Sequence, residues 1–206
     1  MASRYWIMIG AGAAAIAVSA CQSVPADRLY TLSASEDGTA AHTVRATQSY
    51  SVAVGPVTIP EMIDRPQFVV RRGQNEVAVL EEHRWAEPLR TGIPQAIATD
   101  LRTRLTDAQV MTSASSASRD ATYRILLDIE RFESNPGTGV TIHAMWRIRQ
   151  GATNVLLTRQ SRIEEPVSSD GYDQLVSAHG RALAKMSRQM ADALQSLHSE
   201  KRLGRP

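Results

Sequence analysis

Three consecutive segments in the second half of the chain alternate between apolar and polar residues. They cover residues 123–130, 140–149 and 155–164, and turn sequences at Asn135-Pro136-Gly137 and at residues 151–154 separate them. Alternation with a period of two is typical of a strand with one buried face and one solvated face. The pattern therefore predicts an antiparallel meander whose apolar side must be covered by other elements.

Two amphipathic segments can supply that cover. In the first, Ile93, Ile97, Leu101 and Leu105 recur at four-residue steps, as on one face of a helix. In the second, over residues 172–197, an apolar stripe continues for about seven turns of 3.6 residues each. Together with the meander, these helices predict an α+β fold in which a mostly antiparallel sheet has two helices packed on one face.

Shorter β-rich stretches come before the first helix. Residues 28–32 and 50–57 each predict a strand, and residues 68–72 and 76–80 predict a hairpin around a Gly-Gln-Asn turn. Residues 82–89 contain a proline and two adjacent polar side chains at their start, and we expect them to form a turn that leads into the first helix.

The first residues of the chain have the order of an export signal. Met1 to Arg4 form a short basic start, Tyr5 to Ala17 form an apolar centre, and Val18 to Cys21 match a lipobox. Cys21 is the only cysteine, so its thiol has no disulfide partner within the chain. We therefore predict cleavage before Cys21 and attachment of acyl chains to this residue.

A membrane-spanning helix and a buried core helix both fit the apolar run less well. A helix that spans a membrane needs about 20 apolar residues, and this run is shorter. A helix that packs on the core of a small domain would have a polar face, which the run lacks. The chain is therefore expected to consist of a lipoprotein signal peptide over residues 1–20, a tether over 21–27, a single α+β domain over 28–198, and a flexible tail over 199–206.

The charge balance gives no indication of a nucleic-acid partner. The formal net charge is +2, and one of the positive charges is Arg4, which the predicted cleavage removes. A nucleic-acid-binding surface would show a basic stripe interleaved with aromatic side chains. Aromatic residues make up only 5% of the chain, so we expect no nucleic acid among the partners.

Sequence patterns for catalysis and metal binding are missing. No two of the five histidines have the spacing of metal ligands, and no phosphate loop, nucleophile elbow or CxxC pair is present. His179 lies on the apolar stripe of the second helix, where a capped or partly buried histidine is expected. Arg181, Lys185 and Arg188 lie on its outer side, as a solvated face or as a site for an acidic partner or lipid headgroups. We predict a protein that is not an enzyme and needs no cofactor or metal.

The segment from Ile59 to Gln67 is the best candidate for a partner contact. Prolines at both ends restrict its backbone, and rigid loops with apolar tips often contact other proteins. The candidate contact residues are Met62, Ile63, Asp64 and Arg65. An alternative of equal weight is that Met62 and Ile63 pack beneath the sheet and simply fix the turn.

Three segments together resemble a known family. The strand Val52 to Val57, the segment Ile59 to Gln67 and the WAEPL sequence from Trp85 to Leu89 are similar to the ABC-type transport auxiliary lipoprotein family, which includes the membrane-integrity-associated PqiC-like lipoproteins. Family members usually have leucine where this chain has Ile59 and Ile63. The resemblance extends over about residues 28–197 and includes the lipobox.

The resemblance implies a non-enzymatic component of the envelope of Gram-negative bacteria. It implies MCE-domain proteins and inner-membrane transporter components as partners in lipid transport, anchoring in the outer membrane on its periplasmic face, and assembly into homo-oligomeric rings. Gln22 follows the lipidated residue in place of the aspartate that retains many lipoproteins at the inner membrane, which also favours the outer membrane. The alternative function is a lipoprotein subunit of a secretion or assembly pore.

Overall fold

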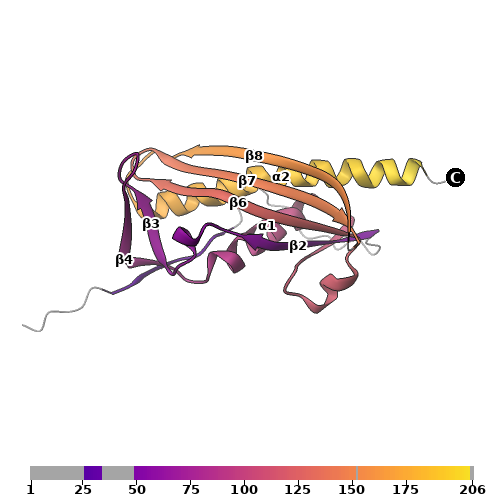
Figure 1. Ribbon diagram of the computed structural model, residues 1–206, viewed down its shortest axis with the longest axis horizontal. Coiled ribbons are helices and arrows are strands. Elements are labelled where there is room, and N and C mark those ends of the chain that lie inside the picture. The colour runs from indigo at the N-terminus through magenta and orange to yellow at the C-terminus, as the bar shows by residue number, and fades with distance from the viewer. Residues whose placement is uncertain (1–25, 34–48, 152, 205–206) are drawn as a thin grey trace, which may run out of the picture.

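The computed structural model describes residues 26–33, 49–151 and 153–204, which form two sheets and two α-helices (Figure 1). The predicted signal peptide, Cys21 and most of the predicted tether lie outside these residues. In chain order the elements are β1 (Arg28–Tyr30), β2 (Tyr50–Thr58), the 3₁₀ turn η1 (Glu61–Ile63), β3 (Gln67–Arg71), β4 (Val77–Trp85), α1 (Leu89–Arg104), β5 (Ala108–Thr112), the 3₁₀ turn η2 (Ser116–Asp120), β6 (Tyr123–Asn135), β7 (Gly139–Gln150), β8 (Asn154–Pro166) and α2 (Tyr172–Leu203).

The larger sheet has five strands in the order β5-β2-β6-β7-β8. The predicted meander is confirmed, because β6, β7 and β8 pair as antiparallel neighbours. The sheet as a whole is mixed, however, since β2 is parallel to both β5 and β6. The connection from β2 to β5 contains helix α1, and a strand–helix–strand connection of this kind makes parallel neighbours.

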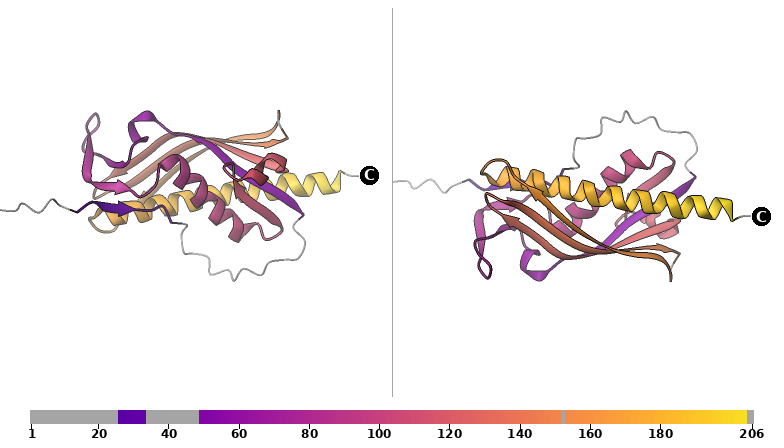
Figure 2. Two further views of the ribbon diagram at one scale, coloured as in Figure 1. Left: turned by 90° about the horizontal axis from the view of Figure 1, so that it is seen from below. Right: turned by 90° about the horizontal axis from the view of Figure 1, so that it is seen from above.

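Both helices pack on one face of this sheet, as predicted (Figure 2). Helix α1 packs against β2 and β5, α2 packs against β7 and β8, and the helices contact each other. The alternating residues of the meander point into this layer: Ile125, Trp146 and Ile148 are completely buried. The indole N–H of Trp146 donates a hydrogen bond to Ser161 Oγ at 2.8 Å, so burial leaves no polar group of this side chain unpaired.

The smaller sheet has three strands in the order β1-β4-β3 and lies at one end of the molecule (Figure 1). The predicted hairpin is present as β3 and β4, but β4 continues to Trp85, and the turn predicted over residues 82–89 is wrong in its first half. The distant strand β1 pairs in parallel with this part of β4, from His83 to Trp85. Backbone pairing therefore extends β4 beyond the point where its own polar residues would end it.

The segment after β1 crosses helix α2. The carbonyl oxygen of Ser33 lies 2.8 Å from the place where a Cβ on Gly180 would be, so only glycine permits this approach. Leu32, next to Ser33, packs against the core. Helix α2 extends through Leu203, into the segment expected to be a tail. Neither helix of the described residues contains an apolar stretch that could cross a bilayer.

Candidate functional site

The candidate partner-binding residues lie in a tight turn between β2 and β3. The backbone N–H groups of Ile63 and Asp64 donate to the carbonyl oxygens of Pro60 and Glu61, both at 3.1 Å, and form the single turn η1. Pro60 precedes this turn and Pro66 follows it, which restricts the backbone at both ends. The turn is thus held by its own backbone bonds and by its prolines.

This turn separates the two apolar candidates. Ile63 is only 6% exposed and belongs to the core, whereas Met62 is 42% exposed. Successive residues of a 3₁₀ turn point about a third of a turn apart, so one side chain can be buried while its neighbour faces solvent. Ile63 therefore packs in the core and fixes the turn, whereas the exposed side chain of Met62 is available for contact with a partner.

The two charged candidates also differ. Asp64 accepts a hydrogen bond from Arg90 Nε at 2.7 Å, which ties the turn to the first turn of α1. Arg65 is exposed and makes no ion pair with any residue of the described part. Asp64 thus helps to position the turn, while the guanidinium of Arg65 is available to a partner.

The WAEPL segment lies directly beside this turn. The N–H of Trp85 donates to the carbonyl oxygen of Pro66 at 2.7 Å, so the two family segments are joined by a backbone hydrogen bond. The Trp85 ring is 7% exposed and packs on Phe68, with 4.8 Å between ring centroids. Pro88 then caps the start of α1. The indole therefore serves as a buried support for the segment that follows it.

Between the two segments there is an open hollow of about 360 Å³. This volume lies in the range of small ligand pockets, about 300–1,000 Å³. Its apolar lining comes from two prolines, an alanine and the indole of Trp85, and its charged groups come from Asp64, Arg65 and Glu87. We name this hollow the motif groove; its lining residues are Asp64, Arg65, Pro66, Trp85, Ala86, Glu87 and Pro88.

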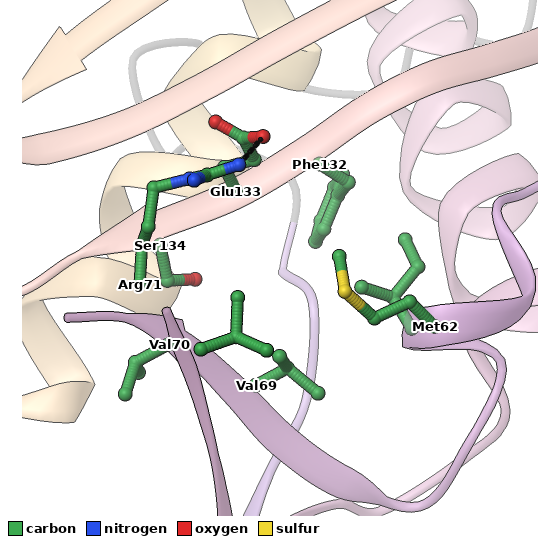
Figure 3. Close-up of a pocket in the computed structure, with 9 residues that line it drawn as sticks. Met62, Val69, Val70, Arg71, Phe132, Glu133 and Ser134 are labelled. Carbon is green, nitrogen blue, oxygen red and sulfur yellow. Dashed lines mark hydrogen bonds and ion pairs between the residues drawn. The ribbon is translucent and has the colours of Figure 1, made fainter. Parts of the chain in front are cut away.

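A second hollow lies on the other side of the turn, below Met62, and holds only about 10 Å³ (Figure 3). Val69, Val70 and Phe132 surround it, and the ion pair between Arg71 and Glu133 at 2.7 Å closes one side. A space this small accommodates about one water molecule. Met62 is one of its lining residues, and it has no room for a larger ligand.

His179 lies behind this region and is completely buried. Its ring stacks on Phe132 at 3.9 Å between centroids, and its Nε2 lies 2.8 Å from Ser134 Oγ. Burial lowers the pKa of His179 to about 3, so the ring is neutral at physiological pH. A neutral ring with no solvent contact is part of the core, and it is more deeply buried than the sequence predicted.

Of the three cations on α2 that the sequence analysis singled out, two are engaged within the molecule. Arg181 and Lys185 both form ion pairs with Glu165, a carboxylate that is only 6% exposed, and Arg181 also donates to the carbonyl oxygen of Pro166. The buried carboxylate accounts for their position, because a buried charge needs partners. Arg188 is exposed and forms no ion pair with any residue that the structure describes.

The described residues contain no group of three or more histidine, cysteine, aspartate or glutamate side chains that could hold a metal ion. The predicted lipidation site, Cys21, lies outside the described part of the chain. Sequence reasoning also missed five lining residues of the groove: Pro66, Trp85, Ala86, Glu87 and Pro88. The signal was present, however, because the WAEPL sequence accompanied the proline-flanked turn in the family resemblance.

The strand next to the predicted tether also takes part in this region. The carbonyl oxygen of Tyr30 in β1 accepts a hydrogen bond from the N–H of Ala86 at 2.8 Å. The Tyr30 hydroxyl lies 2.8 Å from Nδ1 of His83, and the two rings stack. No sequence pattern pointed to this pairing. It attaches the first described strand to the segment that lines the motif groove.

The geometry is that of a mixed sheet with two helices on one face and a preformed groove at which two sequence segments meet. The chain belongs to the family of ABC-type transport auxiliary lipoprotein components, whose sequence profile matches residues 30–191. The resemblance inferred from the turn and the WAEPL segment is thereby confirmed. No curated protein matches the chain by sequence.

Two solved structures share the fold. An uncharacterized protein aligns with a TM-score of 0.67 at 16% identity, over 82% of this chain and 99% of the other. Protein XCC0632 from Xanthomonas campestris aligns with a TM-score of 0.64 at 17% identity, over 85% and 99%. A PelC dodecamer from Paraburkholderia phytofirmans aligns with a TM-score of only 0.39 at 17% identity, over 68% and 86%, which is too low to transfer its fold or assembly.

Proposed function

We propose that this protein is a lipid-anchored periplasmic subunit of an MCE- and ABC-type lipid transport system that maintains the outer membrane, and that it acts by docking partner proteins. The observation that carries this proposal is the motif groove. Two family segments that lie about twenty residues apart in the chain meet in one hollow, joined by the hydrogen bond between Trp85 and Pro66. Residues kept together in this way, at the surface, suit a binding site.

The groove suits a protein partner on physical grounds. Its prolines and the buried indole need no reordering when a partner binds, and a preorganised site loses less conformational entropy on binding. Its apolar lining can take a side chain of a partner, while Arg65 and Glu87 supply one charge of each sign. Complementary charges at a rim contribute chiefly to the rate and specificity of association.

The lipid anchor would keep this groove near the membrane. Each buried methylene of an acyl chain contributes about 0.8 kcal/mol, and stable anchoring needs two such chains or an equivalent second signal. A diacylated or triacylated Cys21 meets that requirement. Cys21→Ser is therefore expected to remove the protein from the membrane fraction; palmitate incorporation at the wild-type level in this variant would contradict the proposed anchor.

The docking role is tested by co-purification of the full-length protein, extracted in detergent, with the MCE-domain protein of the same cell. We expect Arg65→Glu to reduce recovery of the MCE-domain protein strongly. Arg119→Glu is the matched control, because Arg119 is an exposed arginine on η2 at the opposite end of the molecule. Equal recovery with both variants would contradict a docking site in the groove, and no recovery with the wild-type protein would contradict the proposed partner.

A further inference from the structure

The exposed apolar side chains of the described residues are unevenly distributed. Only six large ones are strongly exposed, and four of these belong to the end of the molecule that contains β1, β3 and β4: Leu29, Met62, Val77 and Val79. The other two, Val155 and Leu203, belong to the opposite end, where β8 begins and α2 ends. Scattered single residues would need no explanation, whereas a concentration at one end does.

The exposed valines of β4 lie at the margin of the core: Val77 lines the small hollow beside Met62, and Val79 pairs with Val69. Ala78 and Leu80 alternate with them and pair with Val70 and Phe68, which are completely or almost completely buried. Val77 and Val79 therefore lie on the other side of the strand and are 39% and 38% exposed. A strand with one solvated face usually carries polar residues there. We name this side of the three-stranded sheet the β4 face, defined by Leu29, Val77 and Val79.

We propose that the β4 face rests on the surface of the phospholipid bilayer in which Cys21 is anchored. This inference depends on the lipid anchor of the proposed function and adds a contact between the folded domain and the membrane. The β3–β4 pairing shifts register between Leu80 and Arg84, and the shift puts Arg84 opposite Gln67, on the side of Val79. Leu29 pairs with Arg84, so β1 continues the same face. The face thus includes the strand that the tether enters.

The length of the tether favours the membrane over other occupants. Seven residues lead from Cys21 to Arg28, and an extended chain covers at most about 3.6 Å per residue, so β1 lies within about 25 Å of the anchor. Helix α2, with 32 residues, is about 48 Å long at 1.5 Å per residue. The tether is therefore about half as long as the domain, and it holds the domain by the end that carries the β4 face.

The contact is expected to be apolar rather than electrostatic. Arg28, Arg72 and Arg84 lie on or next to this sheet, but so do Asp27, Glu76, Glu81 and Glu82, and Arg84 forms an ion pair with Asp27. With cations and anions in near balance, attraction to anionic headgroups contributes little. We therefore expect the contact to persist when the salt concentration is raised or when the fraction of anionic lipid is lowered.

The experiment uses the lipidated full-length protein in vesicles of phosphatidylethanolamine and phosphatidylglycerol. Because acylation blocks the thiol of the only native cysteine, Val79→Cys introduces a single site for an environment-sensitive fluorophore. Val155→Cys is the matched control, since Val155 is an exposed valine, 49% accessible, at the opposite end. We expect the fluorophore at position 79 to shift to shorter wavelength and to be quenched by lipids with brominated acyl chains, and the one at position 155 to remain as in water.

Several outcomes would overturn the proposal. The two fluorophores could respond equally, or the one at position 79 could stay in water although the protein floats with the vesicles. Either result would show that the β4 face does not touch lipid, and would leave the proposed lipid anchor unaffected. A shift at position 79 in detergent-free buffer without vesicles would indicate a second copy as the occupant instead. Failure of the protein to float would contradict the anchor itself, and with it both proposals.

Discussion

The two sheets of this protein differ in how they are stabilised and in what they expose. The five-stranded sheet is covered by two helices, and the alternating side chains on that side are buried. The three-stranded sheet is shorter and carries exposed valines, the strand next to the tether and one wall of the motif groove. The comparison indicates that one part of the molecule provides stability and the other provides contacts, so variants of the two parts should affect different measurements.

The largest effect is expected in the helix-covered sheet. Trp146→Ala removes a completely buried indole and leaves Ser161 without its donor, and such a truncation costs about 3–5 kcal/mol. Urea unfolding should show this loss. Met62→Ala is the control, and as an exposed change it should stay within about 0.5 kcal/mol of the wild type. A loss below about 1 kcal/mol for Trp146→Ala would contradict the assignment of stability to this sheet.

A gain in stability is expected at the interface of the two helices. Burial raises the pKa of Asp100 to about 6, so this carboxyl holds its proton more tightly in the folded state than in the unfolded state. Its ionisation at pH 7.5 opposes folding, at a cost of about 1.4 kcal/mol for each tenfold change in proton affinity and so about 3 kcal/mol at most. Asp100→Asn should recover much of this cost at pH 7.5 and lose its advantage below pH 4. A gain that is the same at both pH values would contradict burial as the cause.

A smaller effect is expected where β1 attaches the contact region to helix α2. Gly180→Ala would place a methyl group 2.8 Å from the carbonyl oxygen of Ser33, and overpacking of this kind costs about 1–3 kcal/mol. Thermal unfolding should show the loss, and hydrogen exchange at the amide of Ala86 should become faster because its acceptor, Tyr30, is displaced. Ser177→Ala, an exposed change on the same helix, should leave both measurements unchanged. Unaltered exchange in Gly180→Ala would show that β1 does not depend on this crossing.

The smallest effect is expected from the ion pair of the turn. Asp64→Asn removes the partner of Arg90, and both side chains are partly exposed, so the loss should be about 0.2–1 kcal/mol. Chemical unfolding measures the loss in the free energy of unfolding, and Asp192→Asn, an exposed change on α2, is the control. A loss above about 2 kcal/mol would mean that the turn supports the fold as much as the core does, which would weaken the comparison between the two sheets.

The elements that the sequence predicted are those that follow from local periodicity. The meander and both helices followed from regular alternation and four-residue steps, because one covering layer buries residues such as Ile125 and Leu101 at fixed intervals. Strand β5 and the second half of β4 were missed. Both are formed by parallel pairing with segments more than fifty residues away, and local periodicity contains no information on such partners.

The candidate site was predicted only in part, because it too depends on contacts that spacing along the chain does not show. The prolines indicated a rigid turn, but only the direction of each side chain in η1 decides that Ile63 is buried and Met62 exposed. The hollow itself depends on the backbone bond from Trp85 to Pro66. Spacing along the chain could not reveal this bond, although the resemblance to the family placed both segments in one pattern.

The central claim is that the motif groove docks a protein partner. It is tested most directly by the affinity of the full-length protein for its MCE-domain partner after the groove is filled by Ala86→Leu. Ala117→Leu is the control, an exposed alanine on η2. The account predicts a loss of at least about tenfold in affinity, equal to about 1.4 kcal/mol, for Ala86→Leu and wild-type affinity for Ala117→Leu. Wild-type affinity in both variants would contradict the claim.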